Sequence, residues 1–103
     1  MQDRHRRSEL RSLAYHKAIA KKLKEHPKLW SIPLDNIQRW STGEHGLRDF
    51  YSEWLVIFKT STKNHILSLI VKNDENATRL RSNSPFTGIL SESERMQIYN
   101  DTQ

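Results

Sequence analysis

The chain has 103 residues, of which 35% are hydrophobic, and a formal net charge of +5 at pH 7. This length accommodates one domain and leaves no room for a second. The chain has no cysteine for disulfides or thiolate metal sites, and no run approaches the roughly 18 apolar residues that span a bilayer. We therefore expect a single cytoplasmic domain that does not enter a membrane.

The excess positive charge lies at the N-terminal end. Residues 1–30 hold nine basic and three acidic side chains, nine minus three or +6, whereas residues 31–103 hold eight basic and nine acidic ones, or −1. Such asymmetry is typical of a surface that meets an acidic partner, either a protein or a nucleic acid. We predict a mobile basic arm at residues 1–7 before a single helical domain at residues 8–100. The predicted basic face comprises Arg6, Arg7, Arg11, Lys17, Lys21 and Lys24.

Residues 8–26 have the periodicity of an amphipathic helix. Five side chains fall within one arc at 100° per residue and predict the buried face: Leu13, His16, Ile19, Ala20 and Leu23. Arg11, Lys17, Lys21 and Lys24 fall on the opposite side. Pro27 makes His26 the expected last residue of this helix, because the residue before a proline is disfavoured in helical conformation.

Two further helices are predicted between residues 27 and 60. Pro33 suits a helix start, apolar residues recur every third position to Trp40, and Ser-Thr-Gly at 41–43 ends the segment. The next segment carries a broad apolar face, the pattern of a central core helix, formed by Leu47, Phe50, Tyr51, Trp54, Leu55 and Phe58.

The apolar block at residues 66–71 leaves the fold class with an alternative. WLVIFK and HILSLIV are rich in β-branched and aromatic residues, so a β-hairpin at about 54–71 would give an α+β fold. Helical spacing over more than three turns of 47–58 favours an all-α fold instead. We predict a compact bundle of four to six short helices, packed around Trp54, Phe50, Trp40, Leu23 and Ile70.

The stretch RLRSNSPFTGIL, residues 79–90, interrupts the helical pattern. Asn73-Asp74-Glu75 offers a cap for a short helix through Arg81, and Ser91 with Glu94 forms a capping box for a last helix through about Asn100. Between them, Ser84-Pro85 and Gly88 predict a bend that Phe86 anchors in the core. A second interpretation makes this stretch a partner-binding loop, in which Arg79 and Arg81 clasp a carboxylate or phosphate beside the Ser82 and Ser84 hydroxyls.

No pattern for catalysis, a cofactor or a metal ion is present. The five histidines are never three or four residues apart, and the chain has no glycine-rich phosphate loop and no nucleophile elbow. We expect a protein without enzymatic activity. His16 lies on the apolar stripe of the first helix, where a buried histidine with satisfied hydrogen bonds is favoured over a general base.

Three stretches carry a resemblance to a known group of proteins: RSLAYHKAIAKKL at 11–23, ENATRLRSNSPFTGIL at 75–90, and Glu94-Arg95. Together they resemble small bacterial helical proteins associated with toxin–antitoxin-like or defence operons. The resemblance implies a bacterial cytoplasmic binding protein. Its first candidates for partner contact or fold definition are Arg11, His16, Arg79, Arg81, Ser84, Pro85 and Phe86.

The sequence thus predicts a small antitoxin-like module that binds and regulates or neutralises another protein with an acidic surface. The alternative is a nucleic-acid-binding protein without catalytic activity, which uses the basic first helix. This alternative rests on charge alone, because no zinc-finger spacing or RNA-binding aromatic motif is present.

Overall fold

The computed structural model describes residues 2–42 and 47–103, with side chains described for 6–40, 42 and 51–103. Six α-helices and one 3-10 helix make up the described chain: α1 (Gln2–Glu25), η1 (Pro27–Trp30), α2 (Ser31–Ser41), α3 (Leu47–Thr60), α4 (Lys63–Ile70), α5 (Glu75–Arg81) and α6 (Glu92–Asp101). No strand occurs in these residues, which confirms the all-α prediction. The hairpin alternative at 54–71 is wrong, because α3 and α4 occupy that segment.

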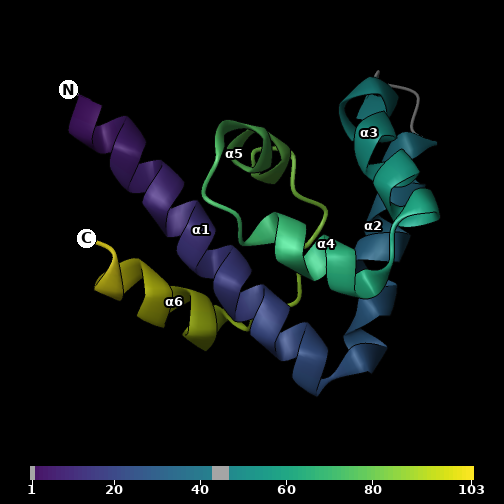
Figure 1. Cartoon of the computed structure of the whole chain (residues 1–103). Helices are drawn as coiled ribbons and strands as arrows, with labels where there is room; N and C mark the ends of the chain where they lie inside the picture. The colour runs from purple at the N-terminus through teal and green to yellow at the C-terminus, as the bar shows by residue number, and fades with distance from the viewer. Residues whose placement is uncertain (1, 43–46) are drawn as a thin grey trace.

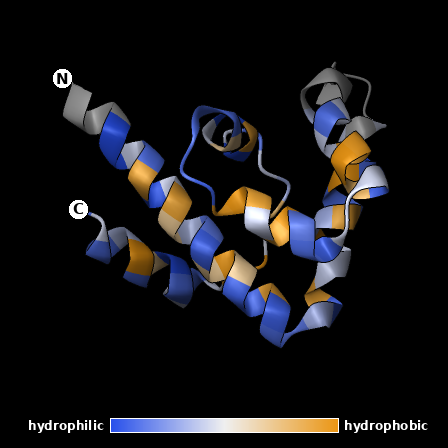
Figure 2. Ribbon diagram, in the orientation of Figure 1, coloured by the Kyte–Doolittle hydropathy of each residue, from blue (hydrophilic) through white to orange (hydrophobic). Residues whose placement is uncertain are grey.

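The long helix α1 is the element against which the others are arranged (Figure 1). Helix α6 runs beside it in the opposite direction, and α4 and α5 also contact it. Helices α2 and α3 pack on each other beyond the C-terminal end of α1. Figure 2 shows α1 banded between hydrophilic and hydrophobic residues, as expected of an amphipathic helix with only part of its surface covered.

Local signals set most helix boundaries. The Thr62 hydroxyl accepts a hydrogen bond from the His65 backbone N–H, and the Asp74 carboxylate accepts one from Ala77. Ser91 and Glu94 form the full capping box that the sequence predicts. These side chains satisfy N–H groups that have no partner in the first helical turn, so α4, α5 and α6 start where the sequence supplies an acceptor.

The start of α1 differs from the prediction. The helix begins at Gln2 and not near Ser8, so residues 2–7 continue the helix where a separate arm was expected. No glycine or proline interrupts this segment, and its glutamine and arginines are good helix formers, so the helix extends towards the N-terminus. The mobility of the segment stays a prediction.

An aromatic cluster forms the centre of the core. Trp54 and Phe86 are each 1% exposed, and their ring centroids lie 5.6 Å apart in an edge-to-face arrangement. The predicted core residues Leu23 and Ile70 are buried as well. The prediction of Trp40 as a core residue is wrong, because Trp40 is half-buried. Its ring packs at a tilt against Tyr51, with 4.8 Å between ring centroids, near the end of the α2–α3 pair. The Phe50 side chain lies outside the described residues.

Candidate functional site

The stretch at 79–90 forms the predicted bend. Gly88 has a φ of +100°, a conformation that side chains with a Cβ rarely adopt. The buried Asn36 side chain on α2 donates hydrogen bonds to the Pro85 and Thr87 carbonyls, both at 2.9 Å. The loop is therefore fixed by an amide from a distant helix, a contact that the loop sequence itself does not reveal.

His16 joins α1 to this bend through a polar chain. Its Nδ1 lies 2.7 Å from the Ser12 carbonyl, which can only accept, so Nδ1 carries the proton. Nε2 then accepts from the Ser84 hydroxyl, also at 2.7 Å, while Ser84 Oγ accepts from the Phe86 N–H. The structure confirms the expectation of a buried histidine with both ring nitrogens partnered.

The contact between Ser84 and His16 has the spacing of a nucleophile and its base, but its electrostatics oppose that role. Burial, assisted by the positive charge of Arg81, lowers the pKa of His16 to about 4. The group that orients the ring is a neutral carbonyl, whereas a catalytic imidazolium is stabilised by a carboxylate. A ring that resists protonation is a weak base for serine, so we interpret the pair as a structural link.

The structure places Arg81 in the interior, only 5% exposed. Its Nη1 donates to the carbonyls of Ile70 and Lys72 at 3.2 and 2.6 Å, and Nη2 donates to Thr78 Oγ1. These contacts close the turn between α4 and α5, where carbonyls at the end of α4 need donors. The Arg81 guanidinium is therefore used inside the fold and is not available to a partner protein.

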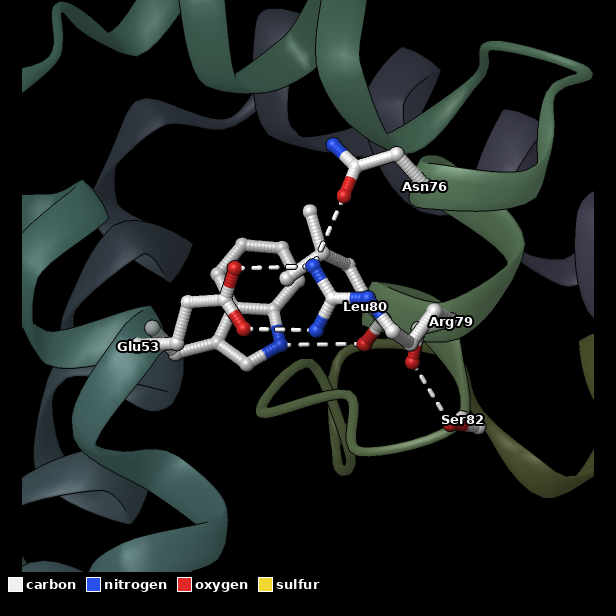
Figure 3. A network of polar contacts seen from close by, with 6 residues as sticks. Glu53, Asn76, Arg79, Leu80 and Ser82 are labelled. Carbon is white, nitrogen blue, oxygen red and sulfur yellow. Dashed lines mark hydrogen bonds and ion pairs between the residues drawn. The ribbon is translucent and has the colours of Figure 1, made fainter.

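Arg79 lies on the outer surface of α5 and is already paired (Figure 3). Its guanidinium forms a two-bond contact with the Glu53 carboxylate of α3, at 2.6 and 2.9 Å, and a third bond with Asn76. Trp54, the residue after Glu53, also bonds to α5, because its Nε1 donates to the Leu80 carbonyl at 3.0 Å. The hydrogen bond from Arg79 holds the pKa of the Glu53 carboxyl below its usual range. This pair joins α3 to α5.

The five side chains predicted as a partner-binding loop are not brought to one surface. Arg81 and Phe86 are buried, Ser84 is bonded to His16, and Arg79 is paired with Glu53. Ser82 is exposed, but its hydroxyl donates to the Arg79 carbonyl. The two guanidiniums expected to act together are separated, because residues two positions apart on a helix point in nearly opposite directions.

We expect Arg79→Ala and Arg81→Ala to differ in stability. Arg81→Ala should lower the free energy of unfolding by about 1.5–3 kcal/mol, since it leaves buried carbonyls without their charged donor. Arg79→Ala removes an exposed ion pair that solvent screens, so its stability should stay close to that of the parent. Urea denaturation of both variants and the parent measures the difference. Equal losses for the two variants would contradict the structural role of Arg81.

The predicted basic face separates into three parts. Arg11 is turned towards α6, where its guanidinium lies 4.1 Å from the centre of the Tyr99 ring and its Nε donates to Thr102 Oγ1 at 3.0 Å. Arg6 and Arg7 lie nearer the N-terminus and line a pocket of about 490 Å³ beside the C-terminal residues. Only Lys17, Lys21 and Lys24 stay together. Arg11 lies six positions before Lys17, which places it about 120° away around the helix.

The three lysines border a groove of about 530 Å³ between α1 and α4. Their spacing of four and three residues places them in one row along the helix. Asn64 and Ser68 border the opposite side, and the apolar part of the lining comprises Ala20, Leu67 and Val71. Lys17, Lys21 and Lys24 are exposed and make no side-chain hydrogen bond or ion pair within the described part of the chain. We name this feature the lysine groove.

The sequence predicted one side of the lysine groove and missed the other. Asn64 and Ser68 lie four residues apart and so share a face of α4, but nothing in the sequence connects that face with α1. Across the described ranges, 2–42 and 47–103, no histidine, aspartate and glutamate cluster could hold a metal ion. Among the same residues no helix is long and apolar enough to cross a bilayer.

No protein-family model matches this chain, and the searches of curated proteins and of solved structures gave no match either. Fold and site together define a small all-α protein with an unpaired cationic groove.

Proposed function

We propose that the protein is a binding module without catalytic activity, and that its lysine groove takes an acidic segment of another protein. The observation that carries this proposal is the row of three cations, Lys17, Lys21 and Lys24, which have no side-chain partner among the described residues. Elsewhere on α1, Arg11 and Lys22 are occupied by α6: Lys22 lies 2.6 Å from a Glu94 carboxylate oxygen. Helix α1 therefore already binds one helix, in part through an acidic side chain.

The apolar lining favours a protein over a nucleic acid. A polypeptide can place acidic side chains against the lysines and apolar ones against Ala20, Leu67 and Val71. A nucleic-acid backbone gains little from such a surface, and the groove contains neither an aromatic ring for base stacking nor an arginine for two-bond phosphate contacts. An amphipathic acidic helix combines both features that the groove offers.

The biological role of the module is a separate part of the proposal. Neutralisation or regulation of the bound protein, as by an antitoxin in the cytoplasm of a bacterium, is supported by the sequence resemblance alone. The groove supports the chemistry of the partner and does not specify its identity.

The decisive variant reverses two charges of the row, Lys17→Glu with Lys21→Glu. We expect it to weaken binding of a labelled amphipathic peptide, with glutamates four and seven residues apart and leucines on the adjacent face, by tenfold or more at physiological salt. Each lysine loses an attraction and gains a repulsion, and about 1.4 kcal/mol already gives a factor of ten. Fluorescence anisotropy measures the affinity.

The matched control, Lys28→Glu with Lys59→Glu, changes the net charge by the same amount away from the groove and should bind the peptide as the parent does. A random DNA duplex distinguishes the nucleic-acid alternative. The proposal is contradicted, and the nucleic-acid alternative supported, if the parent binds the duplex tightly, with an affinity that falls steeply with salt, and the Lys17 and Lys21 variant does not bind it. A pull-down with the parent and the same variant, analysed by mass spectrometry, then identifies the natural partner.

A further inference from the structure

A small cavity of about 180 Å³ lies between α1, the 84–90 bend and α6. Its apolar lining includes Ile19, Phe86 and Leu90, three side chains of the core. This volume is sufficient for several water molecules. The cavity is therefore large enough for a small organic molecule and too small for a nucleotide or a peptide.

Two polar groups at this cavity have no polar partner within the described residues. Arg95 on α6 and Tyr15 on α1 both line it, and neither side chain makes a hydrogen bond, ion pair or ring contact within the described residues. Arg95 is exposed and Tyr15 is half-buried, so the guanidinium and the phenol both stay accessible. His16 and Ser84 also line the cavity, but their hydrogen bonds are used within the fold.

The lack of a partner for Arg95 contrasts with the other side of α6. Glu94, the preceding residue, binds Lys22 and the Ser91 backbone, and Arg11 stacks on Tyr99. The contacts between α1 and α6 thus involve Glu94 and Arg11, whereas Arg95 stays at the edge of the apolar cavity. Apolar walls with a few converging polar groups are the usual composition of a small-molecule site.

We propose that this cavity binds a small monocarboxylate with an apolar body. The body would contact Ile19, Phe86 and Leu90, while the carboxylate would pair with the Arg95 guanidinium and accept a hydrogen bond from the Tyr15 hydroxyl. Arginine holds a planar carboxylate through two parallel bonds, a geometry that suits a ligand with one charged end. The site shares no lining residue with the lysine groove, so it goes beyond the proposed partner binding.

Benzoate titrated into the full chain tests the proposal, with benzyl alcohol as its uncharged analogue. The readout is the NMR signals of the His16 ring nitrogens and of the Phe86 and Gly88 amides, because these groups adjoin the cavity. We expect saturable shifts of these signals with benzoate, tenfold or more weakening in Arg95→Gln, and a smaller loss in Tyr15→Phe. The control variant Lys28→Gln should bind as the parent does.

Three outcomes would overturn this proposal. The first is the absence of saturable shifts at millimolar benzoate, and the second is equal binding of benzyl alcohol, which would show an apolar hollow without charge recognition. The third is unchanged affinity in Arg95→Gln. Arg95 is exposed and its side chain is unpaired in the described structure, so this variant should fold normally, and its thermal melting curve verifies that directly.

Discussion

Replacing Phe86 by alanine is expected to lower the free energy of unfolding by about 3–5 kcal/mol, the range for removing a fully buried aromatic ring. Phe86 is 1% exposed and forms ring contacts with Trp54, Trp30, Phe58 and His16. Its loss leaves a cavity between α1, η1 and α3 that these large rings cannot close by small movements. Urea denaturation followed by circular dichroism at 222 nm measures the change.

Thr87→Ala provides the control for Phe86→Ala. Thr87 is the next residue along the bend, its side chain is exposed, and only its backbone carbonyl bonds to Asn36. Surface substitutions of this kind change stability by about 0.5 kcal/mol or less. A loss below 1 kcal/mol in Phe86→Ala would show that the bend is not anchored in the core by this ring.

Acidification is expected to destabilise the protein by about 3 kcal/mol between pH 7 and pH 4 through His16 alone. The ordinary histidine pKa of 6.5 applies to the unfolded chain, whereas burial lowers the pKa of His16 in the fold to about 4. Between these values the unfolded chain binds the extra proton and the folded chain does not. Stability is therefore complete above pH 6.5 and falls as the pH drops towards 4, with each pKa unit worth about 1.36 kcal/mol.

The variant His16→Gln isolates this effect. This variant should be less stable than the parent at pH 7, but its free energy of unfolding should change little between pH 6.5 and 4.5. The control His65→Gln, at an exposed position, should lose stability with falling pH as the parent does. Glu94 acts in a lower window, because its bonds to Lys22 and Ser91 lower its pKa to about 2, so its contribution is lost below pH 4.5. A parental slope in His16→Gln would show that another group causes the pH dependence.

Prediction from the sequence was most successful where a structural feature depends on neighbouring residues. The cap at Asp74, the capping box of Ser91 and Glu94, and the bend with Gly88 were each predicted and are each present. In all of these, donor and acceptor lie within a few residues, so spacing along the chain determines whether they can meet.

The candidate site was predicted only in part. The row of lysines follows from helical spacing. Arg11 is missing from that row because it contacts Tyr99 of α6 and Thr102 just after α6, some 90 residues further along. Arg79 and Arg81 look equivalent in sequence. Their separation into a surface ion pair and a buried bridge depends on where α3 and the end of α4 lie.

The amino-acid sequence by itself determined the helical class of this protein, most of its helix ends and the positive charge of α1, since periodicity, capping and charge are local properties. The tertiary structure alone decided which of those charges remain free. A cation is available to a partner only if no carbonyl, carboxylate or aromatic ring of the same chain reaches it first. In this fold α6 and the turn after α4 reach Arg11, Lys22 and Arg81, and leave the lysine groove and Arg95 open.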